Sequence, residues 1–127
     1  MRIHRTIGAL VVSVLLLVGC AGDRMVAPAE MRGGVMTDGY GHKTLYTFDR
    51  DTANPTQSNC TGECLVRWPP FRPTEGERAR GDWTIFKRAD GSSQWAYQGK
   101  PVYFFAGDQK TGDRNGEGVN GVWRALK

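Results

Sequence analysis

The chain has little of what most catalytic sites need. It has two histidines, His4 and His42, and no Gly-x-Ser-x-Gly or Cys-x-x-Cys-His segment. Since His4 lies in the N-terminal segment, His42 is left without a second imidazole for zinc, and no serine has a histidine base close by in sequence. We therefore expect no enzyme activity and no cofactor, and we interpret His42 as a solvated turn residue.

The chain also lacks a surface suited to nucleic acid. Its 17 basic and 13 acidic residues are scattered, and they often alternate, as in Asp49-Arg50-Asp51. A basic stripe that could follow a line of phosphates is missing. Nucleic acid is therefore a poor partner.

No apolar run reaches the roughly 20 residues of a membrane span. The longest, residues 7–18, follows Arg2 and Arg5 and ends at Leu17-Val18-Gly19-Cys20. This order is typical of a secretory signal with a lipoprotein cleavage site, where diacylglycerol is attached through the cysteine sulfur. We predict a signal peptide over residues 1–19 and lipidation of Cys20. The alternative is an ordinary signal peptide with a chance cysteine.

This N-terminus predicts a membrane partner and a location. More than one acyl chain on Cys20 gives stable membrane attachment, so the protein would be held at the cell envelope, facing the periplasm or the exterior. Ala21 favours sorting to the outer membrane if the host is Gram-negative. Residues 20–34 have no apolar period and are interpreted as a flexible tether, followed by a folded domain over residues 35–127.

Glycine and aromatic residues indicate short strands in that domain. The chain has 17 Gly, four Trp, four Tyr and five Phe, a mixture that favours strands joined by tight turns. Asp90-Gly91 between two alternating runs predicts a hairpin, and a turn at residues 98–100 extends it to a three-strand meander. The expected fold is a small, mainly β domain of antiparallel strands without a long helix.

An internal repeat divides the domain into two related halves. Leu45-Tyr46-Thr47-Phe48-Asp49-Arg50-Asp51 matches Val102-Tyr103-Phe104-Phe105-Ala106-Gly107-Asp108, and each copy continues through a polar loop to a tryptophan. Tyr and Phe two residues apart share one face of a strand. The Asp at the strand end can cap the loop by accepting backbone N–H bonds. A second interpretation is that the paired aromatics and Asps form a shared binding surface.

These motifs resemble the bacterial secreted repeat of unknown function, a family of lipoproteins with a Tyr-x-[Phe/Trp/Tyr]-x-x-Asp motif. Further matching segments are Cys60-Thr-Gly-Glu-Cys64, Trp68-Pro69-Pro70, Gly99-Lys100-Pro101 and Gly118-Val-Asn-Gly-Val-Trp123. The resemblance covers nearly the whole domain. It implies a cell-envelope protein without an established enzyme role.

Cys60 and Cys64 are the two cysteines left once Cys20 carries lipid. In an oxidising compartment a disulfide is the expected state, and its small loop would contribute about 2 kcal/mol. Redox activity is the alternative, although thioredoxin-type enzymes use a Cys-x-x-Cys spacing.

Two other segments are candidate binding sites. Asp113, Asn115 and Glu117 place three oxygen-bearing side chains within five residues, which makes a weak calcium candidate in a loop that otherwise resembles a plain turn. Trp68, Pro69, Pro70 and Phe71 are expected to be partly exposed, because prolines disfavour a central strand. Exposed aromatics beside prolines suit a protein or glycan partner.

The sequence therefore predicts a non-catalytic binding or interaction module of the cell envelope, with an envelope protein or a glycan as its partner. The alternative function is a redox or metal-handling accessory protein.

Overall fold

A computed structural model describes residues 13–14 and 27–127 of the chain. The predicted signal peptide, except for residues 13–14, and the predicted lipid site at Cys20 lie outside the described residues. Within the described part, no helix has both the length and the apolar character needed to cross a membrane.

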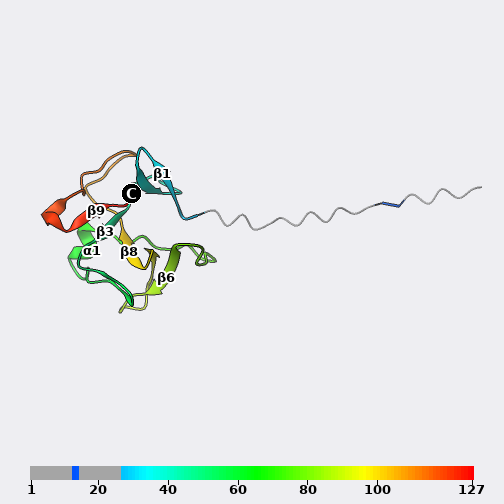
Figure 1. The fold of residues 1–127 in the computed structure, drawn as a ribbon, viewed down its shortest axis with the longest axis horizontal. Helices are drawn as coiled ribbons and strands as arrows, with labels where there is room; N and C mark the ends of the chain where they lie inside the picture. The colour runs from blue at the N-terminus through cyan, green and yellow to red at the C-terminus, as the bar shows by residue number, and fades with distance from the viewer. Residues whose placement is uncertain (1–12, 15–26) are drawn as a thin grey trace, which may run out of the picture.

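Short strands are the main regular elements of the described domain (Figure 1). They are β1 (Ala29–Arg32), β2 (Val35–Asp38), β3 (Tyr46–Phe48), β4 (Thr52–Ala53), β5 (Thr56–Gln57), β6 (Trp83–Lys87), β7 (Ser93–Tyr97), β8 (Lys100–Tyr103) and β9 (Trp123–Ala125). The helical turns are α1 (Cys64–Arg67) and the 3₁₀ turn η1 (Val119–Gly121). The prediction of a mainly β, antiparallel fold is confirmed.

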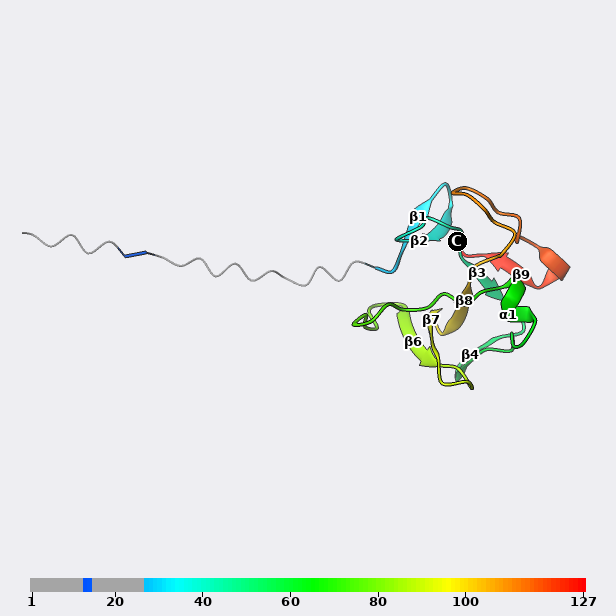
Figure 2. The ribbon, with the colours of Figure 1, turned by 180° about the vertical axis from the view of Figure 1, so that it is seen from behind.

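The largest sheet has the order β6-β7-β8-β3-β9, and all its strand pairs are antiparallel. The predicted meander is present as β6-β7-β8. β3 and β8 meet at the centre, where Tyr46 lies directly opposite Tyr103. The β1–β2 hairpin and the β6 strand lie on opposite sides of this central pair (Figures 1 and 2).

Corresponding backbone hydrogen bonds show that the two halves are built alike. Around the first motif copy, the Leu126 amide donates to Leu45, and the Met36 amide donates to Leu126. Around the second motif copy, the Phe71 amide donates to Val102, and the Trp95 amide donates to Phe71. Leu45 and Val102 precede the two motif tyrosines, so the two motif copies occupy equivalent places around the β3–β8 pair.

The alternation of side chains along β3 and β8 divides the core into two clusters. The motif face carries Val35, Tyr46, Phe48, Cys60, Trp68, Tyr103, Trp123 and Ala125. The other cluster contains Ala29, Leu45, Phe71, Trp83, Trp95 and Val102. Aromatic rings dominate both clusters, which is how a domain of this size fills its interior with few residues.

The folded part begins before residue 35, so the tether expected over residues 20–34 extends too far. Residues 29–32 form β1, which pairs with β2. Gly33 and Gly34, both at positive φ, make the two-residue turn between the strands. A Gly-Gly pair between two strands is a hairpin signal, because both turn residues need φ above zero.

The expectation that residues 68–71 are partly exposed is wrong for both aromatic side chains. Trp68 and Phe71 are each 4% exposed. The segment lies alongside β8, where the Pro69 carbonyl accepts from the Phe104 amide and the Phe71 amide donates to Val102. These bonds need no N–H from either proline, so the prolines permit pairing here instead of preventing it.

The β9 strand explains how Pro70 is tolerated. Ala125 of β9 lies opposite Tyr46, as Pro70 lies opposite Tyr103. The Ala125 amide donates to a Glu117 carboxylate oxygen at 2.5 Å and not to the sheet. Pro70 has no amide hydrogen and needs no such acceptor. At this position the residue makes no N–H bond to the sheet, so a proline costs the sheet no hydrogen bond.

Phe71→Ala is expected to lower the free energy of unfolding by about 3–5 kcal/mol, because it leaves a cavity among buried aromatic rings. Val66→Ala is the matched control, since Val66 is 73% exposed, and it should change stability by less than about 0.5 kcal/mol. Guanidinium denaturation of the exported chain measures both. Equal, small effects would show that Phe71 is a surface residue.

Candidate functional site

The two motif copies exchange their hydrogen bonds across the centre of the sheet. The Tyr46 hydroxyl donates to Asp108 Oδ2, and the Tyr103 hydroxyl donates to Asp51 Oδ2, each at 2.6 Å. Each tyrosine therefore binds the aspartate of the other copy. All four residues are buried, with at most 6% of their surface exposed.

Each aspartate uses its second oxygen to hold its own loop. Asp51 Oδ1 accepts from the Asn59 amide at 2.6 Å, and Asp108 Oδ1 accepts from the Asn115 amide at 2.9 Å. This is the capping geometry that the sequence suggests for an aspartate at a strand end. One carboxylate thus joins a loop of one copy to the central strand of the other.

The tyrosine hydroxyls hold the same two loops. Ser58 Oγ lies 2.6 Å from the Tyr103 hydroxyl, and the Gly116 amide donates to the Tyr46 hydroxyl at 3.3 Å. A side chain at Gly116 would not fit, because its Cβ would lie 2.8 Å from both Tyr46 and Trp68 atoms. The loops after Asp51 and after Asp108 are therefore fixed at equivalent points.

Burial keeps the protons on these tyrosines. The pKa values of Tyr46 and Tyr103 are raised well above the ordinary value of 10.0, first by burial and then by the neighbouring aspartate. Burial also raises the pKa of Asp51, although bonds from Tyr103 and Asn59 oppose this shift. Phenols held in this way are hydrogen-bond donors at neutral pH and not nucleophiles.

A stack of four aromatic rings joins the copies on the motif face. The Trp68 and Trp123 rings are parallel, with centroids 3.7 Å apart. Phe48 of the first copy stacks on Trp123 at 4.3 Å, and Phe105 of the second copy lies 4.5 Å from Trp68. The tryptophan that follows each motif thus packs against the phenylalanine of the other copy. This packing, like the tyrosine–aspartate bonds, makes the motif a core element.

Cys60 and Cys64 form the predicted disulfide, with their Cα atoms 5.3 Å apart. Cys60 is fully buried, and its backbone amide donates to Ser58 Oγ at 3.3 Å. The bond therefore fixes the start of α1 to the same loop that Asp51 and Tyr103 hold.

The three calcium candidates serve separate local contacts. Asp113 Oδ2 accepts from the Gln109 and Lys110 amides, which lower its pKa. Glu117 binds the Ala125 amide, and the Asn115 side chain reaches the Gly107 carbonyl at 3.5 Å. Among residues 27–127, no cluster of three or more His, Cys, Asp or Glu residues is arranged to hold a metal ion.

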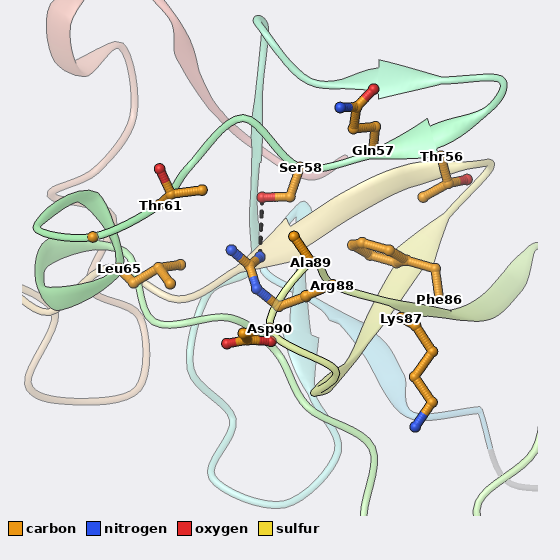
Figure 3. A pocket seen from close by; sticks show the side chains of 11 residues that line it. Thr56, Gln57, Ser58, Thr61, Leu65, Phe86, Lys87, Arg88, Ala89 and Asp90 are labelled. Carbon is orange, nitrogen blue, oxygen red and sulfur yellow. Dashed lines mark hydrogen bonds between the residues drawn. The ribbon is translucent and has the colours of Figure 1, made fainter.

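A pocket of about 270 Å³ opens beside the first anchored loop (Figure 3). Ser58 and Thr61 line it from the loop, Leu65 from α1, and Phe86 and Arg88 from the β6 side. Arg88 is only 7% exposed. Its Nη1 donates to Ser58 Oγ at 2.9 Å, and its Nη2 donates to the Cys60 carbonyl at 2.7 Å.

Sequence reasoning missed Ser58, Asn59, Gly116 and Arg88. The loop contacts had a signal in the spacing, because Asn59 comes eight residues after Asp51 and Asn115 seven residues after Asp108. Arg88 had none, since a single arginine before a turn is ordinarily a solvated residue.

A family model described as a secreted repeat of unknown function matches the chain twice, over residues 29–72 and 84–127. Each match contains one tyrosine–aspartate motif and ends a few residues after its tryptophan. Comparisons with curated proteins and with solved structures give no match.

Tyr103→Phe should lower the free energy of unfolding by about 1–3 kcal/mol, because buried Asp51 loses a charged hydrogen bond. Tyr40→Phe is the control: Tyr40 is 68% exposed, and its hydroxyl donates to Glu77 Oε1 at 3.1 Å. Chemical denaturation of both variants compares them. A Tyr103→Phe variant as stable as the control would mean that the exchanged bond contributes nothing.

Stability should fall as the pH rises above about 10. The unfolded chain releases its tyrosine protons near that pH, whereas folded Tyr46 and Tyr103 retain theirs because their pKa values are raised. This contribution is complete below pH 10 and is lost above it. Melting temperatures between about pH 8 and about pH 11 measure it, and tyrosinate absorbance from these two residues should appear only on unfolding. Titration of all four tyrosines in the folded protein would contradict it.

Proposed function

Because the chain belongs to the family of secreted repeats of unknown function, we propose that it is a non-catalytic binding module, held at the cell envelope by a lipid on Cys20. The domain faces the periplasm or the exterior, and its partner is an envelope protein or a glycan.

The observation that carries this proposal is the fixing of two surface loops by the core. The loops after Asp51 and Asp108 are each held by a buried carboxylate of one copy and a buried phenol of the other. A loop that is already ordered loses little conformational entropy when it binds a partner. Surface loops on a rigid scaffold are the usual location of binding sites.

The same contacts favour binding over catalysis. The motif side chains that could transfer protons or attack a substrate are buried and hydrogen-bonded to each other. Their raised tyrosine pKa values leave the phenols protonated at neutral pH. Neither a redox role nor a metal-handling role draws support from the structure, since buried Cys60 is joined to Cys64 and the carboxylates of Asp113 and Glu117 accept from backbone amides.

The anchor and the binding role are tested separately in cells. Cys20→Ser should move the exported chain from the membrane fraction to the soluble fraction, because the acyl chains are lost. A photo-crosslinking residue at Val66, on α1 beside the first fixed loop, should capture one recurrent envelope component. The same residue at Tyr40, also exposed, serves as the control and should not capture it.

Retention of the Cys20→Ser chain in the membrane would overturn the lipid anchor. Crosslinks that are absent at Val66, or equally diverse at Val66 and Tyr40, would overturn binding through the fixed loop.

A further inference from the structure

Arg88 is a buried cation that forms no direct ion pair with a carboxylate in the described part of the chain, although the Asp51 and Asp90 carboxylates lie close enough to feel its charge. It follows β6 and opens the turn to β7, with its amide donating to the Ser92 carbonyl and its own carbonyl accepting from Gly91. Within residues 27–127, none of the ion pairs with N···O distances up to 4.0 Å includes Arg88. Burying a charge without a carboxylate in direct contact is costly, so such a group in a native structure calls for an explanation.

Its hydrogen bonds leave part of the guanidinium unused. Nη1 donates to Ser58 Oγ and to Gln94 Oε1, and Nη2 donates to the Cys60 carbonyl. Nε is buried and has no hydrogen-bond partner. An arginine carries five N–H groups, so these three bonds leave two of its donors without a hydrogen-bond partner, one of them on the buried Nε.

The pocket over Arg88 has the composition of a site for a small molecule. Leu65, Phe86 and Ala89 give it apolar walls, Ser58 places its hydroxyl on the guanidinium, and Thr61 lines the pocket with its hydroxyl turned away from the guanidinium (Figure 3). Lys87 also lines it, but its amine points away from the guanidinium (Figure 3). Arg88 is therefore the cation that a ligand in this pocket would meet. The usual small-molecule site combines apolar walls with a few fixed polar groups in this way.

We propose that this pocket binds a small molecule that carries one carboxylate beside an apolar group, with Arg88 as the residue that recognises the carboxylate. The proposal goes beyond the binding function proposed above, whose partner is an envelope protein or a glycan, and adds a small-molecule ligand. A guanidinium edge with available donors matches the planar geometry of a carboxylate. The leucine and phenylalanine walls accept the apolar part.

Asp90 favours a carboxylate over a phosphate. Its carboxylate lines the same pocket and is held by the Ser92 amide at 2.9 Å and the Ser92 hydroxyl at 2.6 Å. A fixed negative charge repels a dianion more strongly than a monoanion. The pocket thus discriminates by charge as well as by shape.

The test uses the full exported chain in detergent micelles, labelled with nitrogen-15. N-acetyl-L-leucine is the probe, and N-acetyl-L-leucine amide, which has no charge, is its matched control. The Arg88 Nε–H signal, identified by its absence from Arg88→Lys, should shift with the acid and not with the amide. Affinity for the amide should be about 10- to 100-fold lower, as expected for loss of a charged hydrogen-bonded pair.

Three variants separate recognition from folding. Arg88→Lys should weaken binding of the acid by about 10-fold or more, whereas Lys87→Met should leave it unchanged. Since Arg88→Lys also loses contacts to the loop, Ala89→Glu is the second variant: Ala89 is exposed, so the fold is retained while a like charge blocks the pocket. It should abolish the shift.

Equal binding of the acid and the amide, or no shift of the Nε–H signal with the acid, would overturn the proposal. So would binding that survives Ala89→Glu. If a recurrent component is still captured through Val66 in these cases, the binding function stands and only the carboxylate pocket is wrong. Inorganic phosphate that shifts the signal as strongly as N-acetyl-L-leucine would overturn the preference for a monoanion.

Discussion

The exchange of tyrosine–aspartate bonds between the two motif copies is the interaction on which the rest of the domain depends. Tyr46 and Tyr103 face each other at the centre of the sheet, and each donates to the aspartate of the opposite copy. The buried carboxylates would be costly without these donors. With the tyrosine donors in place, the two carboxylates hold the two long loops in fixed positions. The same pairing of the copies brings the two tryptophans together in a stack.

Much of the fold could be predicted from residue patterns, and the misses have physical reasons. The Asp90-Gly91 hairpin, the meander and the Cys60–Cys64 bond are as expected, because each depends on local geometry or on compartment chemistry. The β1 strand was missed because its alternation is weak and its Gly33-Gly34 turn resembles a linker. The exposure of residues 68–71 was misjudged because a proline lacks only the N–H donor. The bonds between this segment and β8 use the Pro69 carbonyl as an acceptor and the Phe71 amide as a donor, so neither needs a proline N–H.

The candidate site was less predictable than the fold. The motif residues were found by self-comparison, but the spacing within one strand does not reveal that the bonds cross between copies. That exchange depends on the register of β3 against β8, which is a long-range property. The burial of Arg88 could not be predicted for a similar reason. Its neighbours in sequence do not indicate burial, because the groups that cover it, Ser58 and Cys60, lie about 30 residues earlier in the chain.

The crossing of bonds between copies restricts how such repeats can evolve and assemble. In a single copy, the tyrosine hydroxyl has no aspartate acceptor and the aspartate has no tyrosine donor. Both partners are supplied by a second copy of the motif. Chains with two copies satisfy this need internally. A chain with an unmatched copy would leave this phenol and this carboxylate without each other's hydrogen bond in its core. A substitution at Tyr46 therefore removes the hydrogen bond to Asp108 of the second copy and not one to Asp51 of the same copy.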